Sequence, residues 1–90
     1  MTEFHIGDTK LGLMPATGIQ KILGSAVALD SSGTRCELYL DVDDPALFGS
    51  RAIAAGAREL SALAARNWGD DVVYLADPDN HVIAFARKTA

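Results

Sequence analysis

The chain has 90 residues, enough for one small domain with a modest hydrophobic core. Twelve acidic and eight basic residues give a net charge of −4, which argues against a nucleic-acid partner because such modules carry a clustered basic surface. The single cysteine, Cys36, excludes an internal disulfide and a cysteine-based zinc site. No apolar run is long enough to span a bilayer and the N-terminus has no signal-peptide pattern, so we expect no membrane partner and a cytoplasmic location.

The sequence opens with a predicted β-hairpin. Phe4–Ile6 is a short apolar run, and Lys10–Met14 is a candidate return strand. Between them, Gly7-Asp8-Thr9 has the residue types that tight turns favour. Pro15 then ends the ladder, because proline lacks the N–H that a paired strand requires.

A short helix and a linker are predicted next. Thr17–Leu23 fits a helix with Thr17 as its N-cap and Gly24 just past its end. Residues 25–35 include a polar, glycine-containing stretch without periodicity, which is typical of a linker.

Clear signals for a strand and a helix follow the linker. Residues Cys36–Val42 alternate between polar and apolar side chains, which predicts a strand with one face in the core. Asp43-Asp44-Pro45 is a strong helix start, since an acidic cap precedes a proline in the first turn. The helix is predicted to run to about Ala55, and Gly56 supplies its stop.

Three further strands are predicted in the remainder of the chain. They are a short edge strand at Arg58–Leu63, a β-rich run at Val72–Leu75 and a last strand at His81–Arg87. A loop surrounds Trp68, the only tryptophan, and Asp77–Asn80 forms a turn before the last strand. From Cys36 onward the order is therefore β-α-β-β-β, which belongs to the α+β class.

Three segments of this second part match a known pattern. They are the strand end Asp41–Pro45, the helix end Ala54–Ala57, and Trp68-Gly69 followed by the turn Asp77–His81. In this order and spacing they resemble the second module of the vicinal-oxygen-chelate superfamily, which includes glyoxalases, bleomycin-resistance proteins and extradiol dioxygenases. Lys10–Pro15 is similar to the closing strand of that family's first module. The resemblance implies a β-hairpin followed by one βαβββ module, half of a glyoxalase/bleomycin-resistance-like domain.

The same resemblance implies a domain organisation. Residues 1–90 form a single domain, in which residues 1–24 are a remnant of the first module, residues 25–35 a linker and residues 36–88 the second module. A usual family domain holds two modules, so we expect an N-terminally truncated member. One module alone leaves a concave apolar face and unpaired sheet edges, and we therefore expect a homodimer that completes the domain.

The metal positions of the family are largely without ligands here. The resemblance places three of them at Gly12, Glu37 and Ala84, and the fourth in the missing opening strand. Only Glu37 can coordinate a metal, and one carboxylate does not make a site. Neither histidine, His5 or His81, has a partner at helical spacing. We expect no cofactor and no catalytic residue, with a divalent metal as the alternative.

The first functional hypothesis is a metal-free small-molecule binding protein resembling the bleomycin-resistance branch. Its ligand would lie in a cup between modules or subunits. Aromatic side chains would stack on the ligand, and a carboxylate would favour a cationic or hydrogen-bonding group. The expected ligand-binding residues are Met14, Glu37, Tyr39, Trp68 and Tyr74.

Two other functions remain open, and each expected ligand-binding residue could instead have a purely structural role. One is a metal-dependent enzyme of the glyoxalase or dioxygenase type, with a site shared across a dimer, for example through Glu37 and His5 of two chains. The other is a truncated structural remnant without a ligand. Glu37 is equally consistent with a solvated strand residue, and the aromatic residues with caps over the core.

Overall fold

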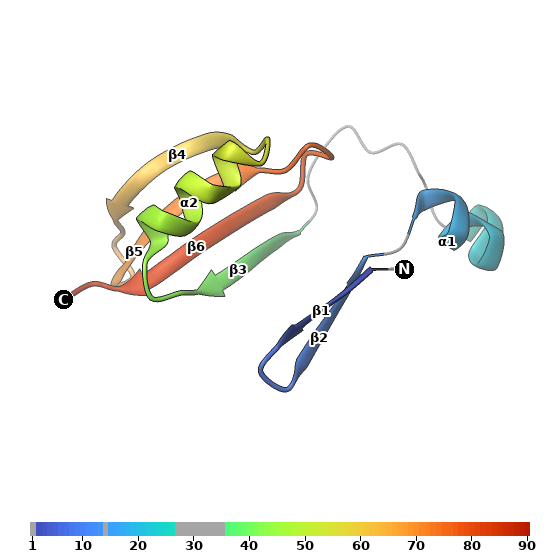
Figure 1. Cartoon of the computed structure of the whole chain (residues 1–90), viewed down its shortest axis with the longest axis horizontal. Helices are drawn as coiled ribbons and strands as arrows, with labels where there is room; N and C mark the ends of the chain where they lie inside the picture. The colour runs from blue at the N-terminus through green and yellow to red at the C-terminus, as the bar shows by residue number, and fades with distance from the viewer. Residues whose placement is uncertain (1, 14, 27–35) are drawn as a thin grey trace. The chain divides into compact units, whose positions relative to one another are not determined.

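A computed structural model describes residues 2–13, 15–26 and 36–90 of the chain, which divides into two units, Met1–Ser32 and Gly33–Ala90. The first unit contains a β-hairpin and a short helix, and the second is a βαβββ module (Figure 1). This α+β arrangement confirms the predicted fold class. Met14 and most of the predicted linker, residues 27–35, lie outside the described residues.

The hairpin pairs β1 (Thr2–Ile6) with the antiparallel strand β2 (Thr9–Leu13). Gly7 in the turn has a φ of 59°, a left-handed conformation that glycine adopts without a steric cost. The register places the larger apolar side chains on one face: Phe4, Ile6, Leu11 and Leu13. None of residues 2–13 and 15–25 is buried, so these residues do not enclose a core of their own.

The helix α1 (Ala16–Leu23) begins directly after Pro15, without a side-chain hydrogen bond at its N-cap. Thr17 lies inside the first turn, so the prediction that Thr17 is the cap is wrong. The fixed φ of proline at Pro15 marks the start instead. The helix ends at Gly24, which has a φ of 59° as its predicted role requires, and a 3₁₀ turn over Gly24–Ala26 follows.

The second unit is a four-stranded sheet covered on one face by a helix (Figure 1). Its elements are β3 (Glu37–Asp41), α2 (Pro45–Ala54), β4 (Arg58–Ala65), β5 (Asp70–Ala76) and β6 (Val82–Lys88). The strand order is β3-β6-β5-β4, with β3 parallel to β6 and the other neighbours antiparallel. Strands β4 and β5 are longer than predicted because their ends pair with each other, with Ala65 opposite Asp71. Alanine has a weak strand preference, so only this pairing defines the end of β4.

Local signals fix both ends of α2. The Asp44 carboxylate accepts a hydrogen bond from the backbone N–H of Leu47 at 3.2 Å, and Pro45 occupies the first turn, as predicted. After the helix, Gly56 has a φ of 111°, which continues the chain out of the helical conformation.

The main core lies between α2 and the sheet. Its buried members are Val73, Leu75 and Phe85, and partly buried side chains surround them: Leu40, Val42, Phe48, Ala52, Ala57 and Ile83. The rings of Phe48 and Phe85 lie 5.6 Å apart. A close approach of helix to sheet depends on Gly49, since a Cβ there would come within 3.4 Å of a Val73 methyl group.

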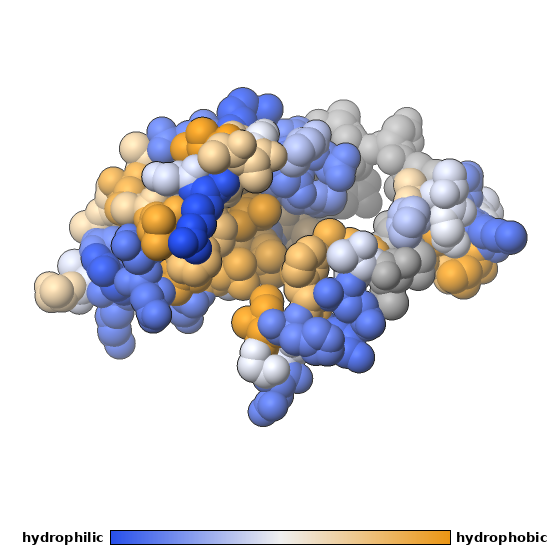
Figure 2. Space-filling view, viewed as in Figure 1, coloured by the Kyte–Doolittle hydropathy of each residue, from blue (hydrophilic) through white to orange (hydrophobic). Residues whose placement is uncertain are grey.

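Hydrophobic side chains also remain at the surface of both units (Figure 2). They include Phe4, Ile6 and Leu13 of the hairpin and Leu47 and Ile53 of α2. In the described part of the chain no helix is long and apolar enough to cross a membrane.

Candidate ligand-binding site

The face of the sheet opposite α2 carries a second, smaller apolar cluster. Val72, Ala84 and Ala86 are fully buried there, and Tyr74 packs against them. In the strand register Tyr39 and Tyr74 both lie opposite Ala84, one from each neighbouring strand. The two tyrosines therefore share this face, and their side chains can cover the small residues between them.

A chain of hydrogen bonds fixes Tyr39 across this face. Its hydroxyl donates to Asp70 Oδ2 at 2.6 Å and accepts from Trp68 Nε1 at 3.0 Å. Because Tyr39 is on β3 and Asp70 on β5, the phenol ring must reach over the intervening strand β6. The indole of Trp68 is thereby oriented, although 55% of the residue is exposed.

The hydrogen bond to Asp70 raises the pKa of Tyr39. Loss of the phenolic proton would remove this bond and place a second negative charge beside the carboxylate. The bond from Trp68 acts in the opposite direction, because it favours the phenolate, but its effect is smaller. Tyr39 thus remains a neutral donor at physiological pH.

Arg66 covers the other tyrosine. Its guanidinium carbon lies 5.2 Å from the centre of the Tyr74 ring, within the range of a cation–π contact. One terminal nitrogen, Nη2, donates to Ser61 Oγ and to the carbonyl oxygens of Ala62 and Val72 at 2.9–3.0 Å. Arg66 Nε is buried without a hydrogen-bond partner in the described part of the protein. These contacts join β4 to β5 and hold Tyr74 in place.

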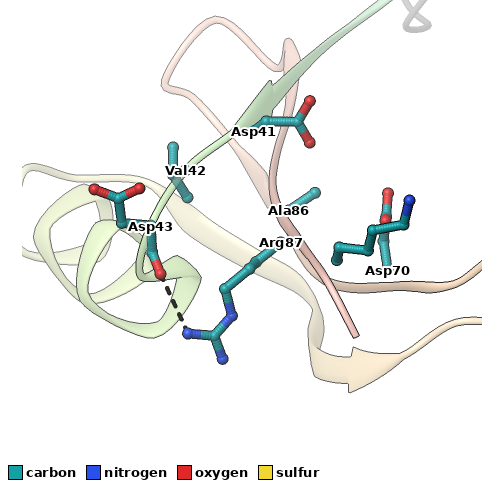
Figure 3. A pocket seen from close by; sticks show the side chains of 7 residues that line it. Asp41, Val42, Asp43, Asp70, Ala86 and Arg87 are labelled. Atoms are coloured by element: carbon teal, nitrogen blue, oxygen red, sulfur yellow. Dashed lines mark hydrogen bonds between the residues drawn. The ribbon is translucent and has the colours of Figure 1, made fainter. Parts of the chain in front are cut away.

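A cleft of about 470 Å³ lies next to Asp70, at the end of the sheet where β6 finishes (Figure 3). Its lining combines acidic, basic and small apolar residues: Asp41, Val42, Asp43, Asp70, Ala86, Arg87 and Lys88. The register places Asp41 beside Ala86, and Asp70 opposite Lys88. Arg87 Nη1 donates to the backbone carbonyl of Asp43 at 3.2 Å, which holds its guanidinium against the turn before α2.

The predicted ligand-binding residues are only partly brought together. Tyr39 and Trp68 are hydrogen-bonded to each other beside the cleft, and Tyr74 shares their face of the sheet. Glu37 lies on the same face but two residues before Tyr39, so along β3 it is farther from the cleft. Met14 lies outside the described residues, and no position is assigned to it.

The sequence reasoning missed two important side chains, Asp70 and Arg66. A signal for Asp70 was present, because it has the same alternation phase as Val72 and Tyr74 on the strand after Trp68-Gly69. Arg66 has no such signal, because its three acceptors come from two strands that only the folded sheet brings together.

The side chains at the metal positions implied by the family do not fit a metal. Ala84 is fully buried and offers no ligand atom, and Gly12 has no side chain. Glu37 is the remaining donor among these positions. One carboxylate does not make a metal site.

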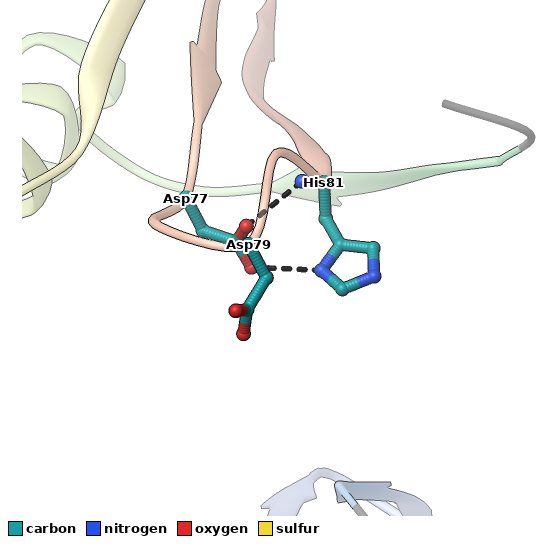
Figure 4. Close-up of side chains that lie close together, drawn as sticks. All are labelled: Asp77, Asp79 and His81. Carbon is teal, nitrogen blue, oxygen red and sulfur yellow. Dashed lines mark hydrogen bonds and ion pairs between the residues drawn. The ribbon is translucent and has the colours of Figure 1, made fainter. Parts of the chain in front are cut away.

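Among the described residues, one group of three side chains could hold a metal ion: Asp77, Asp79 and His81 (Figure 4). Its ligand atoms lie within 4.8 Å of one another, in the turn between β5 and β6. The group has a structural explanation. Asp77 accepts the backbone N–H of His81 at 2.8 Å and contacts the His81 ring at 3.1 Å, while Asn80 has a φ of 71°.

These contacts lower the pKa of Asp77. Partial burial alone would raise it, but the hydrogen bonds from the backbone and ring of His81 and the charge of that ring outweigh the burial. Asp77 therefore stabilises the turn in its ionised form, through its hydrogen bonds with His81.

Comparison with known proteins supports the fold. No protein-family model and no curated protein matches the sequence. Among solved structures, a glyoxalase-related enzyme from Fulvimarina pelagi is 26% identical, with a TM-score of 0.79, over 96% of this chain and 63% of that one. A structure described as a conserved domain protein is 18% identical, with a TM-score of 0.62, over 97% of this chain and 69% of the other. The chain therefore spans less than two thirds of the glyoxalase-related enzyme, and its fold is similar to the part of that enzyme that it covers.

Proposed function

We propose that this protein binds a small molecule without a metal, on the face of the sheet opposite α2. The main support for this proposal is the pair of hydrogen bonds that connects Trp68, Tyr39 and Asp70 at the edge of the cleft. The cleft volume of about 470 Å³ lies in the range of small-molecule sites, about 300–1,000 Å³. Trp68 offers an exposed flat surface for stacking, and its orientation is fixed by Tyr39.

The scarcity of metal-ligand atoms at the family's metal positions supports binding without a metal. At the family's metal positions only Glu37 carries a ligand atom, whereas Ala84 and Gly12 carry none. Binding can instead draw on the stacking surface of Trp68 and on the charged groups of the cleft.

Trp68 provides the test, because it is the only tryptophan and therefore the only source of indole emission. A library of small molecules is screened by thermal shift, and each hit is titrated while Trp68 emission is followed. We expect saturable changes that weaken in Asp70→Asn. Asp79→Asn is the matched control, since Asp79 lies in the turn at the other end of β5. Hits that leave Trp68 emission unchanged, or that bind Asp70→Asn as tightly as wild type, would contradict the proposal.

One observation favours a second candidate. The similar structure from Fulvimarina pelagi is described as a glyoxalase-related enzyme. A metal-dependent enzyme would need ligands from two chains, such as Glu37 of one and His5 of the other. Native mass spectrometry with added nickel, zinc or manganese separates the two candidates. If the wild type binds metal stoichiometrically and Glu37→Gln does not, the enzyme candidate would replace the metal-free proposal. If the protein binds neither a metal nor a small molecule, it would be a structural remnant.

We also propose that the protein is a homodimer. Strands β3 and β4 form the two edges of the sheet and have no second neighbour in the described part of the chain. Apolar side chains at the surface of the hairpin, among them Phe4 and Leu13, add to the surface that a second copy could cover. Sedimentation should give twice the 9.5 kDa monomer mass at micromolar concentration, and a monomer mass would exclude the dimer.

A further inference from the structure

The cleft beside Asp70 holds charged side chains of both signs, and among the described residues these side chains form no ion pair with one another. Lys88 lies directly opposite Asp70 in the pairing of β5 with β6. Even so, the ion pairs found in the described part of the chain are elsewhere, between Lys10 and Glu3 and between His81 and Asp77. Within the described part of the chain the ammonium group of Lys88 is therefore in no ion pair and can contact an anion.

The carboxylates of the cleft are also available. Asp70 accepts from Tyr39 through Oδ2, which leaves Oδ1 free to accept another donor. Within the described residues, the Asp41 side chain takes part in no hydrogen bond or ion pair. Arg87 does not neutralise the acidic side chains either, because the bond found for its guanidinium is to the backbone carbonyl of Asp43.

From this arrangement we infer that the cleft binds a small zwitterion of the α-amino-acid class. The ligand's ammonium group contacts the carboxylates of Asp41 and Asp70, its carboxylate contacts Lys88, and its side chain lies towards Trp68. The inference rests on the proposed function and names the ligand class for the same site.

Ligands of a single charge fit the cleft less well. A metal ion needs converging ligand atoms, and the described group whose atoms converge is the turn Asp77–His81, not the cleft. An organic cation would gain from Asp41 and Asp70 but would meet the like charge of Lys88. An organic anion would gain from Lys88 and Arg87 but would be repelled by the three aspartates that line the cleft. A ligand with both charges can satisfy all of these groups at once.

The test uses the full chain and isothermal titration calorimetry. The twenty common amino acids are titrated at millimolar concentration, and each one that binds is compared with its amide and its N-acetyl derivative. The amide keeps only the positive charge, the N-acetyl derivative keeps only the negative charge, and all three share one side chain. We expect the free amino acid to bind about tenfold more tightly than either derivative, the effect of one charge-assisted contact.

Two variants assign the charges to residues. Asp41→Asn should weaken binding of the free amino acid and of the amide about three- to tenfold, without weakening that of the N-acetyl derivative, which has no ammonium group for Asp41 to bind. Lys88→Gln should weaken binding of the free amino acid and of the N-acetyl derivative by a similar factor, without weakening that of the amide, which has no carboxylate for Lys88 to bind. The matched controls are Asp79→Asn and Lys21→Gln, since neither residue lines the cleft.

Several results would overturn the inference. An amide that binds as tightly as the free amino acid would make the cleft a cation site, and an equally tight N-acetyl derivative would make it an anion site. Affinities unchanged by both Asp41→Asn and Lys88→Gln would place the binding elsewhere. If no amino acid binds, the inference fails, while the library screen with Asp70→Asn decides separately whether the protein binds another class of molecule.

Discussion

Tyr39 is the residue on which the candidate site depends. Its side chain joins β3 to β5 through Asp70 and also carries the bond that orients Trp68. Tyr39→Phe keeps the ring and removes both hydrogen bonds. We expect Trp68 emission to shift in wavelength, because the indole is released to solvent, and the free energy of unfolding to fall by about 0.5–1.5 kcal/mol.

Tyr74→Phe is the control for this variant. The Tyr74 hydroxyl makes no hydrogen bond in the described part of the chain, and its ring is held by Arg66. The emission spectrum of Tyr74→Phe should match that of wild type. If Tyr39→Phe also matched wild type, the hydrogen bond between Trp68 and Tyr39 would not exist in solution.

The raised pKa of Tyr39 gives a prediction for alkaline pH. The ordinary value for tyrosine is 10.0, and the folded state holds the proton more tightly because the hydroxyl donates to Asp70. This contribution to stability is fully present below the unfolded pKa and is lost as the pH rises through the folded pKa. Phenolate absorbance should therefore show Tyr39 titrating above its ordinary range. In Asp70→Asn its pKa should fall, and an unchanged titration would exclude Asp70 as the cause.

The lowered pKa of Asp77 gives a prediction for acid pH. Burial opposes ionisation, but bonds from the backbone and ring of His81 outweigh it and bring the pKa below the ordinary 3.8. The stabilisation is therefore present above the unfolded pKa and is lost as the pH falls through the folded pKa. Urea denaturation should show Asp77→Asn less stable than wild type near neutral pH, with the difference vanishing in acid. Asp79→Asn is the matched control, because the bonds with His81 are made by Asp77.

Only part of the site was predictable at the residue scale. Trp68 and Tyr39 could be selected from the sequence because a lone tryptophan and an alternating strand are local features. Their hydrogen bond joins residues 29 positions apart, and the bond to Asp70 spans 31 positions. Such a connection depends on the strand order β3-β6-β5, in which β3 pairs with the last strand and not with its sequence neighbours.

At the scale of single elements, α2 has a cap that can be tested directly. The Asp44 carboxylate satisfies the backbone N–H of Leu47, which has no partner within the helix. Asp44→Ala should lower the free energy of unfolding by about 0.5–2 kcal/mol, with about 1 kcal/mol typical of an N-cap. Asp43→Ala is the matched control, because the bond found at Asp43 uses its backbone carbonyl. Equal losses in both variants would show that the cap is not the cause.

The elements themselves were predicted well where their signals are local. The hairpin follows from a turn at Gly7, and α2 follows from Asp44 and Pro45. Strand β4 is different, because its register shifts twice against β5, between Glu59 and Ser61 and between Ser61 and Ala64. These irregularities break the alternation that sequence reasoning uses, so the length of β4 could not be predicted.

For the whole molecule, the described core belongs to the second unit. In the first unit none of residues 2–13 and 15–25 is buried, whereas Val72, Leu75, Ala84 and Ala86 are fully buried in the sheet. Stability therefore depends on a small set of side chains on β5 and β6. A chain of 90 residues is expected to have a free energy of unfolding of about 5–13 kcal/mol.

Leu75→Ala tests how far stability depends on this one core. Leu75 is fully buried between α2 and the sheet, so its truncation should cost about 2–5 kcal/mol through lost burial and the cavity left behind. This is a large share of the expected total, and circular dichroism should show a much lower urea midpoint or an unfolded chain. Ile53→Ala removes an exposed side chain from α2 and should change the midpoint little. If both variants lost similar stability, the burial of Leu75 would not be the cause of the loss.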